Sequence, residues 1–415
     1  MASPPRDPCL TFPGRILLAA LYLALILSGC QRDGEPSSSL VRDSAGITIV
    51  ENRTPSWGEG EGWTVADTPS LDIGVLDGPQ EYQFFELAGA VRLADGRIAA
   101  ANAGSGEIRF FDEEGRFLDA VGRQGSGPGE YEEIMWLERT RGDSLLVYDW
   151  QNRRVSVLSS EGAIGRAFEL TVLTTSGGFP VVADPFPNGD LLLAADMFLN
   201  RDASIEGAQR DSALYFVIHP DGTSWDTLGA YPGGESYQTS DGENWVGGGL
   251  VFGRFGYGAV AGDGFYYGSS DRYEIEYRDS SGQIRRLIRL PHENLPVTQE
   301  DIDRYVEDRL AGARDERRRQ IYRTMFERMP FPATMPAYGD FMVDLEGNLW
   351  VGETRRPGDD QPRWRIFDPE GTYLGKVDTP KNLRIFEIGS DYVLGRGRDE
   401  MEVDHLRMYP LRKSS

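Results

Sequence analysis

Residues 93–122 read LADGRIAAANAGSGEIRFFDEEGRFLDAVG, and this stretch decides the fold. Short runs of β-forming residues alternate here with tight-turn signals, at Asp95-Gly96, Ala103–Gly106 and Glu113–Gly115. The runs predict three strands after an inner strand at Leu87–Leu93, namely Arg97–Ala101, Glu107–Phe111 and Arg116–Val121. Four short antiparallel strands in meander order make one blade of a β-propeller.

The same unit recurs along the chain. The turns that open its second strand are Asp95-Gly96, Gly142-Asp143, Asn188-Gly189, Asp263-Gly264, Glu346-Gly347 and Ser390-Asp391. The first three turns lie 47 and 46 residues apart, a normal blade period, and the longer later gaps predict insertions. Blades bury their faces only by stacking into a ring, so six units predict an all-β, six-bladed propeller of four-stranded antiparallel blades over residues 41–415. We expect the spare strand Ile47–Glu51 to complete the sixth blade.

A helical insertion is predicted before blade five, at about residues 298–328. Thr298 can cap it, with Asp301 as the reciprocal partner. Apolar residues mark one buried face, at Ile302, Tyr305, Val306 and Leu310. Gly312 is expected to divide the segment into two helices. A lid over one propeller face and a docking element are both open interpretations of it.

Residues 1–29 have the features of a secretory signal peptide. Arg6 and Arg15 are basic, and Ile16–Leu27 is an apolar run shorter than a comfortable membrane span. The sequence Leu27-Ser28-Gly29-Cys30 resembles the lipobox of bacterial lipoproteins, which implies cleavage before Cys30 and a diacylglycerol on its sulfur. An ordinary signal that contains a cysteine is the alternative. Residues 30–40 are then a flexible tether.

Charge and cysteine content limit the partners. The net charge of −23 disfavours nucleic acid and anionic lipid headgroups. Cys9 and Cys30 are the only cysteines, and Cys9 would leave with the signal, so the mature chain would have no disulfide. We expect membrane attachment through the lipid and an unknown protein or small ligand as partner. The absence of Asp after Cys30 implies, by the lipoprotein resemblance, the outer membrane facing the periplasm.

A family resemblance rests on blade one and the link after it. Asp95-Gly96-Arg97, Glu107–Asp112 and Glu114–Leu118 resemble an NHL-type repeat, and Gly122–Tyr131 resembles the blade-to-blade crossover of that family. The chain is thus similar to bacterial six-bladed propeller lipoproteins over residues 41–415. The glycines of the crossover suggest a phosphate cradle as an alternative, but no Gly-Lys-Ser/Thr ending and no helix follow them.

Aromatic residues recur where each crossover enters an inner strand, and most are expected to pack between blades. These residues are Phe84, Phe85, Tyr131, Phe179, Phe255 and Tyr338. The remainder are expected at a ligand-facing rim, together with nearby basic and aromatic residues. The candidate ligand-face residues are Tyr131, Phe179, Arg254, Tyr257, Tyr338 and Lys381.

Signals for metal binding and catalysis are weak. His219, His292 and His405 lie in different units without zinc-ligand spacing. Asp359-Asp360 and the acidic residues of Asp399–Asp404 could hold calcium, but no EF-hand-like spacing appears and we interpret them as solvated turns. We assign no catalytic residue and no metal ligand, and we expect no cofactor, with a divalent metal such as calcium as the open alternative.

Two function classes remain from the sequence. The first is a non-enzymatic ligand- or protein-binding scaffold at the cell envelope, with loops near Asn200–Arg210 and Glu235–Gly249 and the helical insertion as its contact surface. The second is a metal-dependent propeller hydrolase of the lactonase-like type, although the chain has no Gly-x-Ser-x-Gly elbow and no His-Glu-x-x-His. Fold alone does not decide between them.

Overall fold

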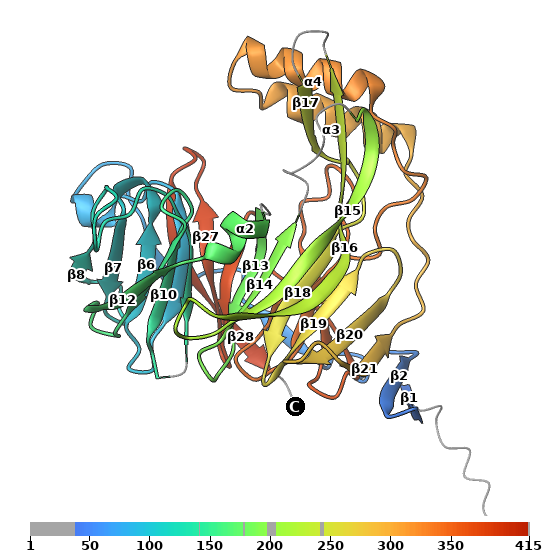
Figure 1. Ribbon diagram of the computed structural model, residues 1–415, viewed down its shortest axis with the longest axis horizontal. Coiled ribbons are helices and arrows are strands. Elements are labelled where there is room, and N and C mark those ends of the chain that lie inside the picture. The colour runs from blue at the N-terminus through green and yellow to red at the C-terminus, as the bar shows by residue number, and fades with distance from the viewer. Residues whose placement is uncertain (1–37, 141, 177–178, 197–204, 241–244, 414–415) are drawn as a thin grey trace, which may run out of the picture. The chain divides into compact units, whose positions relative to one another are not determined.

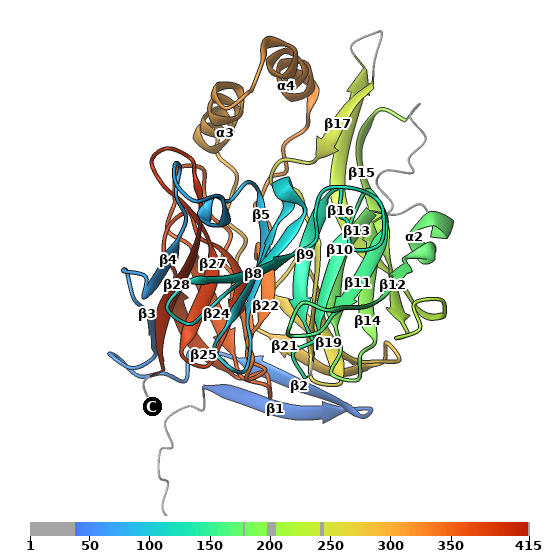
Figure 2. The ribbon, with the colours of Figure 1, turned by 90° about the vertical axis from the view of Figure 1, so that its left-hand side faces the viewer.

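The computed structural model describes residues 38–140, 142–176, 179–196, 205–240 and 245–413. Residues 38–415 form one unit that contains six β-sheets (Figures 1 and 2). Each sheet has four propeller strands, and the inner strands of successive sheets lie beside one another. The predicted six-bladed propeller is confirmed. No helix in the described ranges is long and apolar enough to cross a membrane.

Blade one follows the turn pattern of the sequence closely. Its strands are β5 (Leu87–Arg92), β6 (Ile98–Asn102), β7 (Glu107–Phe111) and β8 (Phe117–Val121). Between β7 and β8, Gly115 donates its N–H to the Asp112 carbonyl at 3.0 Å, and Asp112 Oδ1 accepts the N–H of Arg116 at 2.8 Å. Gly115 has φ +82°, which a left-handed turn position requires and glycine adopts without strain.

The other blades repeat this meander. Blade two contains β9 (Ile134–Arg139), β10 (Leu145–Asp149), β11 (Arg154–Leu158) and β12 (Ile164–Glu169). Blade three contains β13 (Phe179–Pro185), β14 (Leu191–Asp196), β15 (Gly207–Ile218) and β16 (Trp225–Ser240), with β17 (Trp245–Gly249) added. Blade four contains β18 (Gly256–Ala261), β19 (Gly264–Ser269), β20 (Glu274–Asp279) and β21 (Ile284–Arg289). Blade five contains β22 (Asp340–Val343), β23 (Leu349–Gly352), β24 (Arg363–Phe367) and β25 (Tyr373–Asp378). Blade six contains β26 (Arg384–Ile388), β27 (Tyr392–Arg398) and β28 (Asp404–Lys413). A short helix, α2 (Thr171–Ser176), links blades two and three.

The N-terminal strands close the ring differently from the prediction. Strand β2 (Ile47–Asn52) pairs in parallel with β21 on the outer edge of blade four, and β1 (Ser39–Ser44) pairs with β2. The expectation that Ile47–Glu51 completes blade six is therefore wrong. Blade six is completed by β3 (Trp63–Val65) and β4 (Leu71–Ile73), which both pair antiparallel with β28. These strands have only three residues each, too few for their alternation to stand out in the sequence.

Large side chains fill the interfaces between blades. Tyr131 is fully buried between blades one and two, in a cluster with Ile108, Phe110 and Leu145. Between blades four and five the cluster is mainly aromatic and includes Tyr266, Tyr273, Tyr338, Phe341, Phe367 and Tyr373. Flat aromatic rings bury much area per residue at such wide interfaces, which supports the inter-blade role expected for most of the crossover aromatics. Phe85, in contrast, is 60% exposed.

A superstructure rises from blades three and four on the side away from β1 and β2 (Figure 1). It consists of the long ends of β15 and β16, strand β17, and helices α3 (Gln299–Ala311) and α4 (Glu316–Arg328). Thr298 and Asp301 form the predicted capping box, and α3 ends at Gly312. Met325 and Phe326 of α4 pack with Tyr237 of β16. The helices and the extended blade-three strands therefore share one small core.

Two contact loops were expected in this region, and the structure corrects that expectation. Residues Glu235–Gly249 are mainly strand, because Ser236–Ser240 of β16 pair with Trp245–Gly249 of β17. Of Asn200–Arg210, residues 207–210 belong to β15, whereas 200–204 lie outside the described residues. Gly247, Gly248 and Gly249 stand inside β17.

Candidate functional site

A groove of about 860 Å³ lies between α3, blade five and blade six. Tyr305 of α3 and Phe252, from the link before β18, contribute aromatic side chains to it. Asp340 and Arg384, the first residues of the inner strands β22 and β26, also line it. The link between β23 and β24, residues 353–362, forms much of the remaining wall. The groove therefore combines apolar surface with charges of both signs.

Helix α3 is fixed to blade five beside this groove. Arg356, in the β23–β24 link, forms an ion pair with Asp301 in the first turn of α3 and donates a hydrogen bond to the Pro296 carbonyl at 3.2 Å. Arg304 of α3 donates to the Pro357 carbonyl at 3.4 Å. Arg254 adds a second tie, since its guanidinium donates to the carbonyl and hydroxyl oxygens of Thr334 at 2.8 and 2.7 Å. The groove wall is thus held by several directional contacts.

Asp340 and Arg384 give the groove its electrostatic character. Asp340 is reached by solvent through the groove, but the surrounding protein displaces enough water to raise the pKa of its carboxyl to about 6. Burial and the nearby Arg396 lower the pKa of Arg384, although a guanidinium remains protonated at neutral pH. Neither side chain forms an ion pair with a described residue. Asp340 and Arg384 attract each other at longer range, and Asp404 also acts on Arg384, so a bound ligand meets two charges that are only partly compensated.

Other charges around the groove are already paired. Arg363 donates to Asp378 at 2.6 Å, and Lys381 donates to Asp360 at 2.9 Å. Glu353 accepts from Arg365 and Lys376 at 2.7 and 2.9 Å. The exposed pairs of Arg363 and Lys381 contribute little stability, whereas Glu353 and Arg365 are mostly buried.

Three carboxylates from three blades approach one another near the far ends of the inner strands. Glu138 of β9 interacts with Asp184 of β13 and Glu387 of β26, and burial raises the pKa of all three, that of Asp184 to about 6. Glu387 accepts the N–H of Arg92 at 3.0 Å and lies 3.4 Å from Arg139. The side chain of Glu138 thus sits among like charges.

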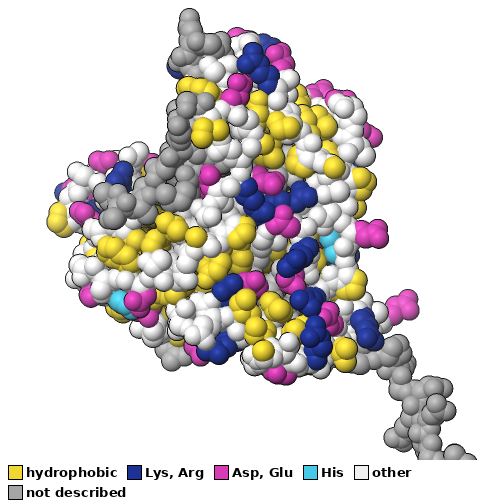
Figure 3. Space-filling view, turned by 45° about the vertical axis from the view of Figure 1, so that its right-hand side comes forward, with side chains coloured by type: hydrophobic (Ala, Val, Ile, Leu, Met, Phe, Trp, Pro, Cys, Tyr) yellow, Lys and Arg dark blue, Asp and Glu magenta, His cyan; other side chains and the backbone are white. Residues whose placement is uncertain are grey.

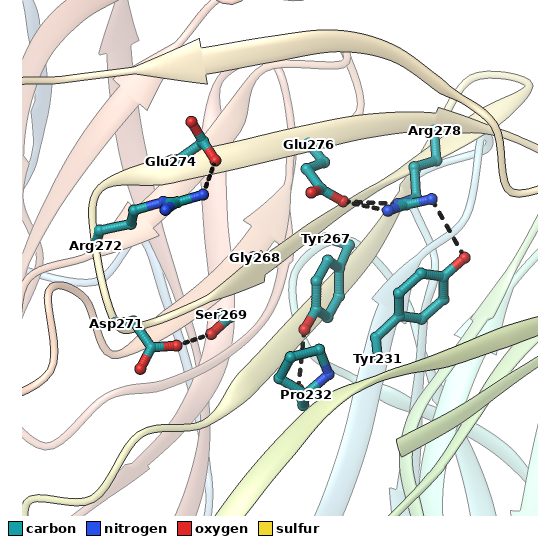
Figure 4. Close-up of a pocket in the computed structure, with 10 residues that line it drawn as sticks. All are labelled: Tyr231, Pro232, Tyr267, Gly268, Ser269, Asp271, Arg272, Glu274, Glu276 and Arg278. Atoms are coloured by element: carbon teal, nitrogen blue, oxygen red, sulfur yellow. Dashed lines mark hydrogen bonds and ion pairs between the residues drawn. The ribbon is translucent and has the colours of Figure 1, made fainter. Parts of the chain in front are cut away.

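A smaller cleft of about 400 Å³ lies where blade three meets blade four (Figure 4). Arg278 pairs with Glu276 at 2.5 Å and lies 4.5 Å from the ring centre of Tyr231. Tyr267 donates its hydroxyl hydrogen to the Pro232 carbonyl at 2.9 Å. The polar groups of this cleft satisfy one another, so we interpret it as a blade-to-blade contact.

The structure separates the six predicted ligand-face residues. Tyr131 and Tyr338 are completely buried, so their prediction as ligand contacts is wrong and they are packing residues. Tyr257 is half-buried and packs against Phe255 and Tyr338. Lys381 is exposed beside Asp360 at the groove, and Arg254 is held by Thr334. Phe179 lies in β13, and its side chain is outside the described residues, as is Cys30.

The histidines and acidic clusters make local contacts. His219 lies 3.2 Å from Asp190, and His405 lies 2.7 Å from Asp72. Asp399 accepts the N–H groups of Met401 and Val403 at 2.9 Å each, as expected of a turn. In the described part of the chain, no group of three or more His, Cys, Asp or Glu side chains is arranged to hold a metal ion.

Five charged residues at the two ends of the inner strands were missed by the sequence reasoning. They are Glu138, Asp184, Asp340, Arg384 and Glu387. Each lies in a strand that the ring buries on both sides, where a charge is unusual. Aligning the six inner strands with one another would have exposed these positions, whereas searching for turns and histidines did not.

The fold defines this chain as a six-bladed β-propeller. Residues 82–160 match a family model described as 6-bladed beta-propeller. A Bacteroides fragilis protein described as exported is 12% identical, with a TM-score of 0.48, over 88% of this chain and 100% of that chain. Virginiamycin B lyase from Staphylococcus aureus is 11% identical, with a TM-score of 0.40, over 84% and 99%. A luciferin-regenerating enzyme is 10% identical, with a TM-score of 0.41, over 83% and 95%. Among curated proteins, none matches the sequence. Function is therefore argued from this chain's own residues.

Proposed function

We propose that this protein is a lipid-anchored propeller of the bacterial cell envelope that binds a ligand or partner protein without covalent chemistry. The observation that carries the proposal is the pair Asp340 and Arg384, two unpaired opposite charges in a groove of about 860 Å³. Aromatic side chains beside them add apolar area, as is usual in binding sites. A ligand that fits has a hydrogen-bond donor for Asp340, an anionic or carbonyl acceptor for Arg384, and an apolar group. A peptide has all three.

The orientation of the groove supports the proposed anchor at Cys30. Seven residues separate Cys30 from Ser38, where the described chain begins, and they reach at most about 25 Å. Strand β1 follows directly and lies on the side away from α3 and α4 (Figure 1). An acylated Cys30 would therefore allow the groove to face away from the membrane. The outer membrane, with the propeller in the periplasm, remains our proposed location.

A metal-dependent hydrolase is the second candidate. Glu138, Asp184 and Glu387 are the residues on which it would rest, since carboxylates are the ligands that a hard divalent cation such as calcium prefers, but the described side chains are not arranged as a metal site. This candidate predicts hydrolysis of lactone or ester substrates that a chelator abolishes and calcium restores. The same activity would be reduced in Glu138→Gln. Such turnover would overturn the binding-only proposal.

The binding proposal is tested with a photo-crosslinking amino acid placed in the groove. Met342 and Ile385 both line the groove, whereas Leu118 is 50% exposed on blade one and serves as the control position. We expect one defined crosslinked species in cells from the two groove positions, lost when Arg384→Glu is added. Identical products from all three positions, or groove products that persist with Arg384→Glu, would contradict the proposal.

A further inference from the structure

A second groove lies beside the N-terminal strands, on blade four. Its volume is about 760 Å³, and its charged lining residues are Arg42, Arg53, Arg272, Arg289, Glu51 and Glu274. Arg42 lies in β1 and Glu51 in β2, whereas Glu274 and Arg289 lie in β20 and β21. Figure 3 shows that Lys and Arg side chains gather on this side of the molecule, toward its lower right.

The two carboxylates of this groove are shared by three arginines. Glu51 lies 3.1 Å from Arg42 and 3.0 Å from Arg289. Glu274 lies 2.6 Å from Arg289 and 2.5 Å from Arg272. Burial opposes ionisation of both carboxyls, but the arginine hydrogen bonds outweigh it and lower the pKa of each. Both glutamates are therefore ionised at neutral pH, and one arginine charge is left over.

Arg53 adds a second positive charge. Its side chain is exposed at the groove and makes no hydrogen bond or ion pair with a described residue. His292, also in the lining, contributes none at neutral pH because burial and the nearby Arg365 lower its pKa. The charged groups of this groove thus sum to +2 on a chain of net charge −23. A phosphate group carries one to two negative charges, and guanidinium groups bind it through paired hydrogen bonds.

The position of the groove indicates where such a phosphate comes from. Arg42 lies four residues after Ser38, and seven residues separate Ser38 from Cys30. We propose that this groove binds the phosphate of an anionic lipid headgroup in the leaflet that holds the anchor. The inference rests on the proposed acylation of Cys30, which places Ser38, two residues before the groove residue Leu40, within about 25 Å of the membrane surface. The contact would fix the orientation of the propeller on the membrane.

The net negative charge of the chain does not prevent this contact. At physiological salt the Debye length is about 8 Å, so acidic residues on distant blades are largely screened. The tether also makes headgroup binding intramolecular, with an effective concentration on the order of millimolar. A weak site is therefore sufficient once the chain is anchored.

The test couples the protein to vesicles chemically. A chain that begins at residue 30 has Cys30 as its only cysteine, and its thiol can react with a maleimide lipid. This chain retains the complete unit 38–415 and needs no acylation by a cell. The measurement is amide hydrogen exchange of residues 39–53 on vesicles of phosphatidylcholine alone or mixed with phosphatidylglycerol.

We expect slower exchange of residues 39–53 on the phosphatidylglycerol vesicles only. Each arginine near a membrane surface changes binding about five-fold, so Arg53→Gln should reduce the difference about five-fold and high salt should abolish it. Arg166→Gln, an equal charge change on exposed β12 of blade two, should leave it unchanged. Equal exchange on both vesicles, or a difference untouched by Arg53→Gln, would overturn the proposal. If dissolved glycerol phosphate slows the exchange of residues 39–53 but phosphatidylglycerol vesicles do not, the assignment to the membrane is also overturned. Failure of acylation in cells would refute the proposed anchor and the membrane contact in the cell, whereas the vesicle measurement tests the groove itself.

Discussion

Arg356 of blade five pairs with the same carboxylate oxygen of Asp301 that accepts the N–H and hydroxyl hydrogens of Thr298 at 2.9 and 2.7 Å. One side chain of α3 thus caps its own helix and ties that helix to the propeller. Asp301 is buried, with 7% of its side chain exposed, so the contact is only slightly screened on that side. This carboxylate is therefore one of several contacts that hold the wall of the groove between α3, blade five and blade six.

Removal of Arg356 should loosen α3 without unfolding the ring. In Arg356→Ala the capping box remains, but the charge-assisted hydrogen bond across the groove is lost. We expect local opening of α3 to become easier by about 1 kcal/mol, because Arg356 is partly exposed. Hydrogen exchange of residues 299–311 reports this as roughly five-fold faster exchange. Arg304→Ala, which loses a 3.4 Å hydrogen bond to the same link and an exposed ion pair with Glu300 at 3.7 Å, is the matched control and should have a smaller effect.

The buried carboxylates predict a dependence of stability on pH. Burial raises the pKa of Glu138 and Glu387, and that of Asp184 to about 6, whereas carboxyls titrate near 4 in an unfolded chain. Raised folded-state pKa values mean that the stabilising contribution is complete below about pH 4 and is lost as the pH rises through about 6. We expect Glu138→Gln to raise Tm by about 2 °C at pH 7.5 and to leave it unchanged at pH 4. Glu300→Gln, with 82% of its side chain exposed, should change neither value, and equal gains at both pH values would contradict this explanation.

Asn52 joins the N-terminal hairpin to blade five. Its side chain donates to the Gly371 carbonyl at 3.0 Å and accepts the N–H of Tyr373 at 2.8 Å, both in buried surroundings. Asn52→Ala leaves both backbone groups without this partner, which should lower the free energy of unfolding by about 1–3 kcal/mol. Urea denaturation measures the change. Gln299→Ala, at the exposed start of α3, should change the free energy of unfolding by no more than about 0.5 kcal/mol. A loss of stability equal to that of Asn52→Ala would argue against a specific role for Asn52.

Two glycines with similar backbone angles should respond differently to alanine. Gly106 has φ +68°, and an added Cβ would lie 2.8 Å from backbone atoms of the blade-one crossover. Gly46 has φ +81° and open space around it. Gly46→Ala should lower the free energy of unfolding by about 1–2 kcal/mol, because only the left-handed backbone conformation disfavours alanine there. Gly106→Ala must also displace the crossover, so its loss of stability in urea should be clearly larger. Similar losses of stability in the two variants would mean that the crossover moves aside without an energetic cost.

The anchor prediction concerns Cys30. In Cys30→Ala the thiol that would carry the lipid is absent, so we expect an unprocessed precursor or loss from the membrane fraction. Fractionation of cells followed by mass spectrometry of the N-terminus measures both. A processed, membrane-bound Cys30→Ala protein would show that the lipobox prediction is wrong. Recovery of the wild type in the inner membrane would refute only the outer-membrane location.

The fold could be predicted from the sequence because its turns are local. Asp112 and Gly115 define a turn through contacts within four residues, and each blade repeats that logic. The partner of a strand is not local information. The alternation in Ile47–Glu51 identified a strand correctly but could not indicate that its partner is β21 rather than β28.

The candidate site was much harder to predict. Asp340 and Arg384 belong to different blades and share one groove only because the ring brings β22 and β26 together. Tyr131 and Tyr338 were placed on a ligand face because the sequence showed where they occur but not which way they point. The direction of a side chain at the start of an inner strand depends on packing against the neighbouring blade.

Closure of blade six joins the two ends of the described chain, and this has a consequence for the timing of folding. His405 of β28 lies 2.7 Å from Asp72 of β4, although 333 residues separate them. The loop that must close is nearly as long as the propeller itself, and contacts of such high sequence separation form slowly. In a chain exported as we propose, folding follows translocation, so β3 and β4 stay unpaired until β28 has also crossed the membrane. Until then, the unpaired edges of these strands are open to other chains, so the newly made protein should depend on a chaperone during this interval.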